Sequence, residues 1–194
     1  MKKLGYLSMI ALLAFTFQSC NSNSKNSNDN ADSLNTMDTT FNTDTTAGMA
    51  ADQDDTEFAG KAAVGGMAEV EFGKIALSKS TNAEVKAFAD MMVKDHGKAN
   101  EELKTIASSK NITLPTSLDE EHTKKMNDLN KLTGRDFDKE YVNAMVDGHK
   151  KTLDLMEKEA KDGKDAELRA FASKTAPIVK AHLDQIQKID DSMK

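Results

Sequence analysis

Three histidines and one glutamate are the residues of this chain whose types and spacing could do chemistry. His96, His149 and His182 each fall at helical spacing on a stripe of apolar residues. Glu69 precedes Phe72 on a fourth stretch of helical pattern. Side chains on the apolar stripe of a helix face the core. Four such helices would bring three imidazoles and one carboxylate together, because a rise of about 1.5 Å per residue places them at similar heights.

A buried cluster of this kind suits a metal ion. Neutral imidazole binds zinc, copper, iron and nickel, and thioethers favour Cu(I); the spacing Met-x-x-x-His occurs twice, beginning at Met92 and Met145. Di-iron bundles, however, need Glu-x-x-His on two helices, and Val93 and Val179 stand where those glutamates would be. A histidine on an apolar stripe is more often a hydrogen-bonded core residue. The sequence therefore favours structural histidines without a cofactor, and a divalent transition metal or copper on these four side chains is the alternative.

An internal repeat shows which elements position these residues. Residues 83–89 (AEVKAFA) recur as residues 166–172 (AELRAFA), and the offset of 83 residues that carries Glu84 onto Glu167 extends backwards without a gap. Each copy has room for two helices joined by a short turn, so the pattern indicates a duplicated helical hairpin. The expected helices span residues 56–79, 82–109, 136–161 and 165–191.

Residues at the expected helix ends support these bounds. Thr81 with Glu84 forms a capping box for the second helix, since hydroxyl and carboxylate satisfy unpaired backbone N–H groups. Gly163 can end the third helix in the left-handed conformation, and Asp165 can cap the fourth. Ser117 can cap a further short helix in the connector.

The connector between the hairpins decides the topology. Residues 111–134 separate the second and third long helices, and Pro115 prevents the second helix from continuing. A connector of that length can run along the whole bundle, whereas an up-down-up-down bundle needs only a few residues. We expect an all-α, ferritin-like four-helix bundle, built from a duplicated hairpin with a long crossover that contains a short helix.

Several short motifs resemble a known family. They are Phe88-Ala89, Met91-Met92-Val93-Lys94-Asp95-His96, Leu132-Thr133-Gly134, Phe137-Asp138 with Tyr141, and Pro177 with His182-Leu183. In combination they resemble the bacterial envelope family known as domain of unknown function 4142, over residues 57–189. The resemblance implies a ferritin-like fold and an outer-membrane protein, and it implies no established activity.

The N-terminal segment has the features of an export signal. Lys2 and Lys3 precede an apolar stretch at residues 4–17, and Ser19 is followed by Cys20, the only cysteine. This pattern predicts a signal peptide at residues 1–19 and lipidation of Cys20. An ordinary signal peptide cut elsewhere is the alternative, and the stretch is short for a retained membrane helix, which needs about 20 residues. Residues 20–55 are rich in Asn, Ser, Thr and Asp, so we expect a disordered tether before a domain at 56–194.

Charge and motif content exclude several functions. The formal net charge is −6, and cleavage before Cys20 would remove Lys2 and Lys3, leaving 24 basic against 32 acidic residues and a charge of −8. Nucleic acid is therefore an unsuitable partner, because phosphate binding needs clustered basic residues. The chain has no nucleophile-and-base pattern and no Gly-rich phosphate loop. We expect a lipid-anchored outer-membrane protein with a non-catalytic structural or interaction role, and a metal-binding or metal-dependent redox protein is the alternative.

Overall fold

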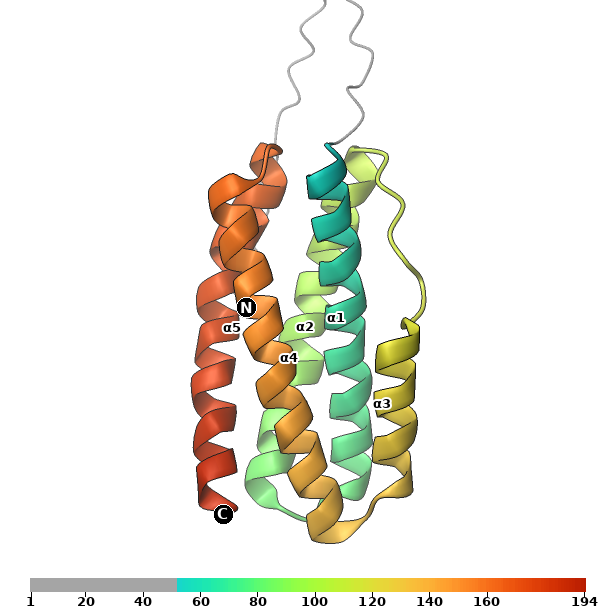
Figure 1. Ribbon diagram of the computed structural model, residues 1–194, viewed down its shortest axis with the longest axis vertical. Helices are drawn as coiled ribbons and strands as arrows, with labels where there is room; N and C mark the ends of the chain where they lie inside the picture. Colours follow the sequence, from blue (N-terminus) through green and yellow to red (C-terminus); the bar gives the residue numbers. More distant parts are fainter. Residues whose placement is uncertain (1–51) are drawn as a thin grey trace, which may run out of the picture. The chain divides into compact units, whose positions relative to one another are not determined.

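Five α-helices make up the part of the chain that the computed structural model describes, residues 52–194 (Figure 1). They are α1 (Gln53–Lys79), α2 (Ala83–Ser109), α3 (Glu120–Lys131), α4 (Gly134–Asp162) and α5 (Ala166–Ser192). These residues contain no strand, so the predicted all-α class is confirmed. None of the five helices has an apolar stretch long enough to cross a membrane. The predicted signal peptide, Cys20 and the predicted tether up to residue 51 lie outside the described residues.

The four long helices run side by side, and α3 packs against α1 and α4 (Figure 1). Short turns join α1 to α2 and α4 to α5, so each pair is antiparallel, as the repeat predicts. Between the pairs, residues 110–119 and α3 lead back along the helices. As a result α4 starts at the same end as α2 and the two run parallel (Figure 1). The long connector makes this parallel arrangement possible.

Two predicted helix caps are wrong by one or two residues. Asn82, not Thr81, caps α2: its side chain accepts hydrogen bonds from the backbone N–H groups of Glu84 at 2.9 Å and Val85 at 3.2 Å. Asp119, not Ser117, caps α3. Asn and Asp are as good as or better than Ser and Thr at this position, and here each stands directly before the first helical residue.

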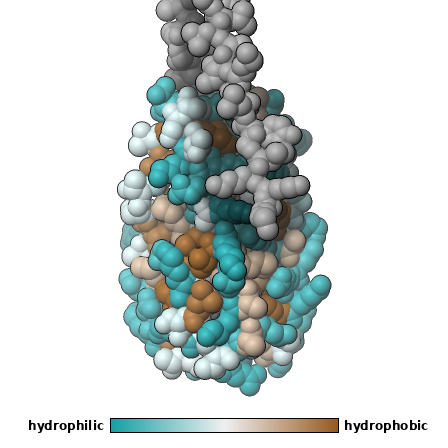
Figure 2. Space-filling model, turned by 180° about the vertical axis from the view of Figure 1, so that it is seen from behind, coloured by the Kyte–Doolittle hydropathy of each residue, from teal (hydrophilic) through white to brown (hydrophobic). Residues whose placement is uncertain are grey.

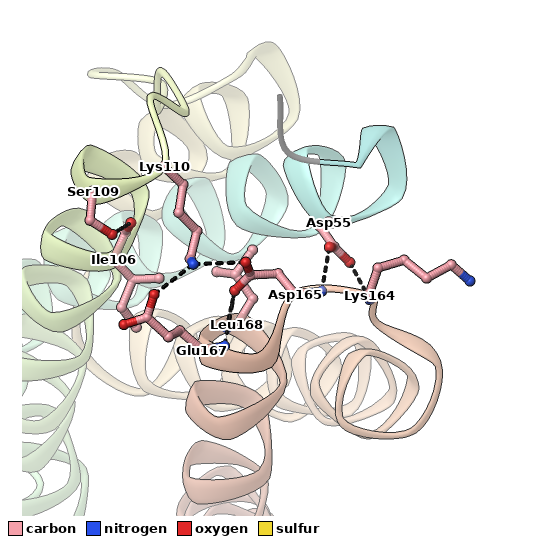
Figure 3. A network of polar contacts seen from close by, with 8 residues as sticks. All are labelled: Asp55, Ile106, Ser109, Lys110, Lys164, Asp165, Glu167 and Leu168. Atoms are coloured by element: carbon pink, nitrogen blue, oxygen red, sulfur yellow. Dashed lines mark hydrogen bonds and ion pairs between the residues drawn. The ribbon is translucent and has the colours of Figure 1, made fainter. Parts of the chain in front are cut away.

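The α4–α5 turn is held by a side chain from another helix. Gly163 has a φ of −57°, so the predicted left-handed end of α4 is wrong. The chain leaves α4 extended, and the buried carboxylate of Asp55 on α1 accepts the backbone N–H groups of Lys164 at 2.9 Å and Asp165 at 2.7 Å (Figure 3). The predicted cap of α5 is confirmed, because Asp165 accepts the N–H groups of residues 167 and 168.

A lysine ties the end of α2 to the same turn. The ammonium of Lys110 lies 2.7 Å from Oδ2 of Asp165 and 2.6 Å from Oε2 of Glu167 (Figure 3). Together with Asp55 these contacts connect α1, α2, α4 and α5 at one end of the helices. The position of the hairpins relative to each other is therefore set by polar contacts as well as by the core.

The core consists of two apolar clusters separated by a polar layer. One cluster includes Phe72, Phe88 and Phe137, and the other includes Phe58 and Phe171. Between the two clusters, each long helix carries one buried histidine or glutamate of this layer: Glu69, His96, His149 or His182. Burying polar groups costs free energy unless they find partners. Stabilisation of the fold therefore does not explain why this layer is polar.

Candidate metal centre

Each long helix contributes one side chain to the polar layer. Glu69 comes from α1, His96 from α2, His149 from α4 and His182 from α5. Their side chains are between 0 and 6% exposed. The sequence analysis predicted these four residues on the inward faces of the helices, and the structure brings all four together.

Glu69 lies against two of the histidines. Its Oε2 is 2.7 Å from Nδ1 of His96, and its Oε1 is 3.5 Å from Nδ1 of His149. Neither contact has hydrogen-bond geometry, so both carboxylate oxygens lack a hydrogen-bond donor. Glu69 thus places a negative charge beside the Nδ1 edges of these two rings.

The other two ring contacts are hydrogen bonds. Nδ1 of His149 lies 2.8 Å from the backbone carbonyl oxygen of Met145, one turn earlier on α4. Nε2 of His182 lies 3.1 Å from Oδ2 of Asp95 on α2. A carbonyl or carboxylate oxygen can only accept, so these two ring nitrogens carry the hydrogen. In the neutral rings the opposite nitrogens then hold lone pairs.

The opposite nitrogens have no partner. Nε2 of His96, Nε2 of His149 and Nδ1 of His182 are all buried without a hydrogen-bond partner. The ring centroids of the three histidines are 5.4 to 5.6 Å apart. One nitrogen from each ring lies within 4.8 Å of a nitrogen from each of the others. Buried polar atoms are normally hydrogen-bonded, so a partnerless nitrogen on each of three neighbouring rings calls for an explanation.

The ring of Phe88 packs against two of the three histidine rings. The ring of Phe88 lies 5.8 Å from that of His149 and 6.4 Å from that of His182, measured between centroids. Met92 and Met145, from the two Met-x-x-x-His pairs, are buried in the apolar cluster on the same side. Phe88 therefore limits the rotation of His149 and His182 on this side.

Burial and neighbouring charges shift the pKa values of Glu69 and His96 in opposite directions. Burial would raise the pKa of Glu69, but the imidazoles of His96, His149 and His182 outweigh it and lower that pKa to about 2. Burial would lower the pKa of His96, but the charge of Glu69 outweighs it and raises that pKa above its ordinary value. The carboxylate of Glu69 is therefore ionised, and its charge favours the protonated form of His96, so a metal ion that binds His96 would release this proton.

The other two imidazoles are held in the neutral form. Burial, with the charge of His96, lowers the pKa of His149 even though Glu69 opposes the shift. Burial also lowers the pKa of His182, to about 4, despite the adjacent Asp95. Neutral rings are the form in which histidine binds metals.

Asp95 is the site residue that sequence reasoning missed. It lies beside the apolar stripe of α2, so the stripe gave no reason to count it with the inward-facing residues. Its place directly before His96 was the available signal, because it points toward the neighbouring helix. The fourth histidine, His122, lies away from the cluster on α3, where its Nδ1 is 2.6 Å from Oδ1 of Asp119.

Comparison with known proteins adds the family. No curated protein matches the chain. The crystal structure of a DUF305 fragment from Deinococcus radiodurans has a similar fold, with a TM-score of 0.65 and 9% sequence identity over 73% of this chain and 98% of that one. The family model for a domain of unknown function, DUF4142, matches residues 40–189. The predicted family is confirmed: the chain belongs to the DUF4142 family.

Proposed function

We propose that the protein binds one transition-metal ion between His96, His149 and His182. The observation that supports this is that the two nitrogens of each ring have different surroundings. One nitrogen lies beside an oxygen: of Glu69 for His96, of the Met145 carbonyl for His149 and of Asp95 for His182. The other nitrogen is buried without a hydrogen-bond partner. Metal-binding histidines show this arrangement, because an acceptor on one nitrogen orients the ring and makes the other more basic.

The geometry suits ions that accept three imidazoles. Neutral imidazole suits zinc, copper, iron and nickel. If the three nitrogens stood at the full 4.8 Å from one another, each would move inward by about 0.7 Å to reach a metal–nitrogen distance of about 2.0–2.1 Å. Side-chain rotation can supply such a movement. Three histidine ligands also leave a fourth position for water or another small ligand.

Glu69 fits an orienting role better than that of a ligand. It faces Nδ1 of both His96 and His149, which is the edge opposite their free nitrogens. From there its charge stabilises the cation that the rings hold and fixes the orientation of His96. This assignment differs from the alternative raised by the sequence, in which all four side chains bind the metal.

The ferritin-like four-helix bundle stays part of this proposal. The parallel course of α2 and α4 and the connector that contains α3 support it. The missing Glu-x-x-His motifs argue against a di-iron centre. We therefore propose a mononuclear site on this scaffold.

Metal analysis of the full-length protein isolated from its own cells tests the proposal. We expect about one equivalent of metal, and titration of the metal-free protein to saturate at one ion per chain. At 100 times the dissociation constant, binding contributes about 2.7 kcal/mol, which raises the melting temperature by roughly 8 °C. His149→Ala should lose both effects, and His122→Ala, the matched control on α3, should keep them. Equal melting shifts in these two variants would refute the central site.

A lipid anchor at Cys20 is a separate proposal that rests on the sequence. The apolar segment and Ser19-Cys20 support it, as does the expectation of an outer-membrane location. Mass spectrometry should find acyl groups on an N-terminal Cys20, and more than one chain, since a single chain gives only marginal binding. Cys20→Ala should release the protein from membranes. Unchanged membrane association of that variant would contradict the anchor. A structural or interaction role in the envelope is compatible with both proposals.

A further inference from the structure

The buried centre needs a route by which an ion can reach it. The site side chains are almost completely enclosed, but Asp95, which is bonded to His182, has 42% of its side chain exposed. It is thus a carboxylate that touches solvent on one side and a site imidazole on the other. Carboxylates attract hydrated divalent cations, and local negative charge raises their rate of arrival.

The side of the helices formed by α1 and α4 is covered at the level of the site. There α3 packs on both helices, and its Glu121 lies 2.9 Å from Nζ of Lys151, two residues beyond His149. Close helix packing adds to this cover, because Gly148 of α4 faces Glu69. An ion approaching from this side would have to displace a helix.

The seam between α2 and α5 has no such cover among residues 52–194. Its outer edge is closed by polar side chains instead: Asp95 bonds His182 at 3.1 Å, and two turns along Glu102 pairs with Lys174 at 2.7 Å. Figure 2 shows the side of the molecule away from α1 and α4, where mainly hydrophilic residues surround a few hydrophobic ones.

We propose that Asp95 and His182 form the entry gate of the metal centre. This inference rests on the proposed function. Asp95 binds the incoming divalent cation first and in doing so releases Nε2 of His182. The freed ring rotates and passes the ion to the inner nitrogens, after which the Asp95–His182 hydrogen bond re-forms. Asp95 is thus a positioning residue at equilibrium and the first contact during loading.

Loading kinetics with Co²⁺ alone test the gate. The full-length metal-free protein is mixed with Co²⁺ in a stopped-flow instrument, and the visible absorption of the bound ion gives the loading rate. Asp95→Asn keeps a hydrogen-bond acceptor for His182 but removes the charge, so loading should slow by at least about tenfold. One ion per chain should still bind at equilibrium. Glu102→Gln, which breaks the neighbouring ion pair on the same seam, should load at the wild-type rate.

A second variant separates loading from positioning. Asp95→Ala removes both the charge and the acceptor, so it should load as slowly as Asp95→Asn and also bind about 10–100 times more weakly. If both variants load at the wild-type rate and differ only in release, Asp95 merely positions His182 and the gate is refuted. If the wild-type protein binds no Co²⁺ or other transition metal, the proposed function fails and the gate fails with it.

Discussion

Replacing Glu159 by glutamine should change how the stability of the protein depends on pH. Glu159 lies on α4 beneath the α4–α5 turn and is buried, with one carboxylate oxygen that lacks a partner. A Cβ added at Gly163 would lie 2.7 Å from its Cδ, so the carboxyl group fills the space inside the turn. Asp55 and Asp165, which both belong to the network in Figure 3, are its acidic neighbours.

The direction of the effect follows from the pKa. Burial, reinforced by the charges of Asp55 and Asp165 and only partly offset by Arg169, raises the pKa of Glu159 from 4.5 to about 7. Between these values the folded state binds more protons than the unfolded state. The free energy of unfolding therefore falls as pH rises from 4.5 to 7. The loss of stability caused by ionised Glu159 is absent below pH 4.5 and complete above pH 7.

The magnitude can be bounded. The difference between a pKa of 4.5 and one of about 7 would correspond to about 3.4 kcal/mol if fully expressed. Glu159 also borders a cleft of about 100 Å³ lined by Lys61 and Lys158, among others, and solvent and these charges reduce the penalty. We expect Glu159→Gln to be more stable than the wild type by about 2 kcal/mol at pH 8 and nearly equal to it at pH 4.5.

Urea unfolding followed by circular dichroism, in the presence of a chelator, measures this difference. The quantity to compare is the free energy of unfolding of the variant minus that of the wild type, measured from pH 4.5 to 8.5. The titration of other groups cancels in this difference. Glu157→Gln, at an exposed position on the same helix, should give a difference that does not vary with pH. A flat difference for Glu159→Gln would refute the reasoning.

Two further predictions concern packing and the polar layer. A Cβ at Gly73 would lie 3.0 Å from the carbonyl oxygen of Ala89, whereas one at Gly97 would meet nothing within 4 Å. Gly73→Ala should therefore lower the free energy of unfolding by about 1–3 kcal/mol, and Gly97→Ala should raise it by about 0.5–1 kcal/mol, as measured by urea unfolding. The reverse order of stability would contradict the packing. In the metal-free protein, His149→Met should stabilise by about 1 kcal/mol, since it replaces an unsatisfied polar ring by an apolar side chain of similar length. A loss of stability in that variant would instead favour structural histidines.

The helices and their order could be predicted from the sequence. The apolar period and the repeat at an offset of 83 residues are local patterns, and they predict four long helices and the short turns within each hairpin. The short motifs indicated the family through resemblance. The long connector indicated that the second and third long helices run parallel. These features depend on neighbours along the chain, which is why they can be read without coordinates. The helix ends were less certain, because Asn82 and Asp119 competed with Thr81 and Ser117 for the capping positions.

The candidate site was predictable only in part. Inward-facing stripes placed Glu69 and the three histidines in one layer, since each residue's face depends on its own helix. Which ring nitrogen is held and which is free depends on the rotation of each side chain against another helix, and no local pattern encodes that rotation. Asp95 belongs to the site only because α5 lies beside α2. Only the tertiary structure therefore shows that one nitrogen of each ring has no hydrogen-bond partner and that Glu69 lies beside Nδ1 of His96 and His149.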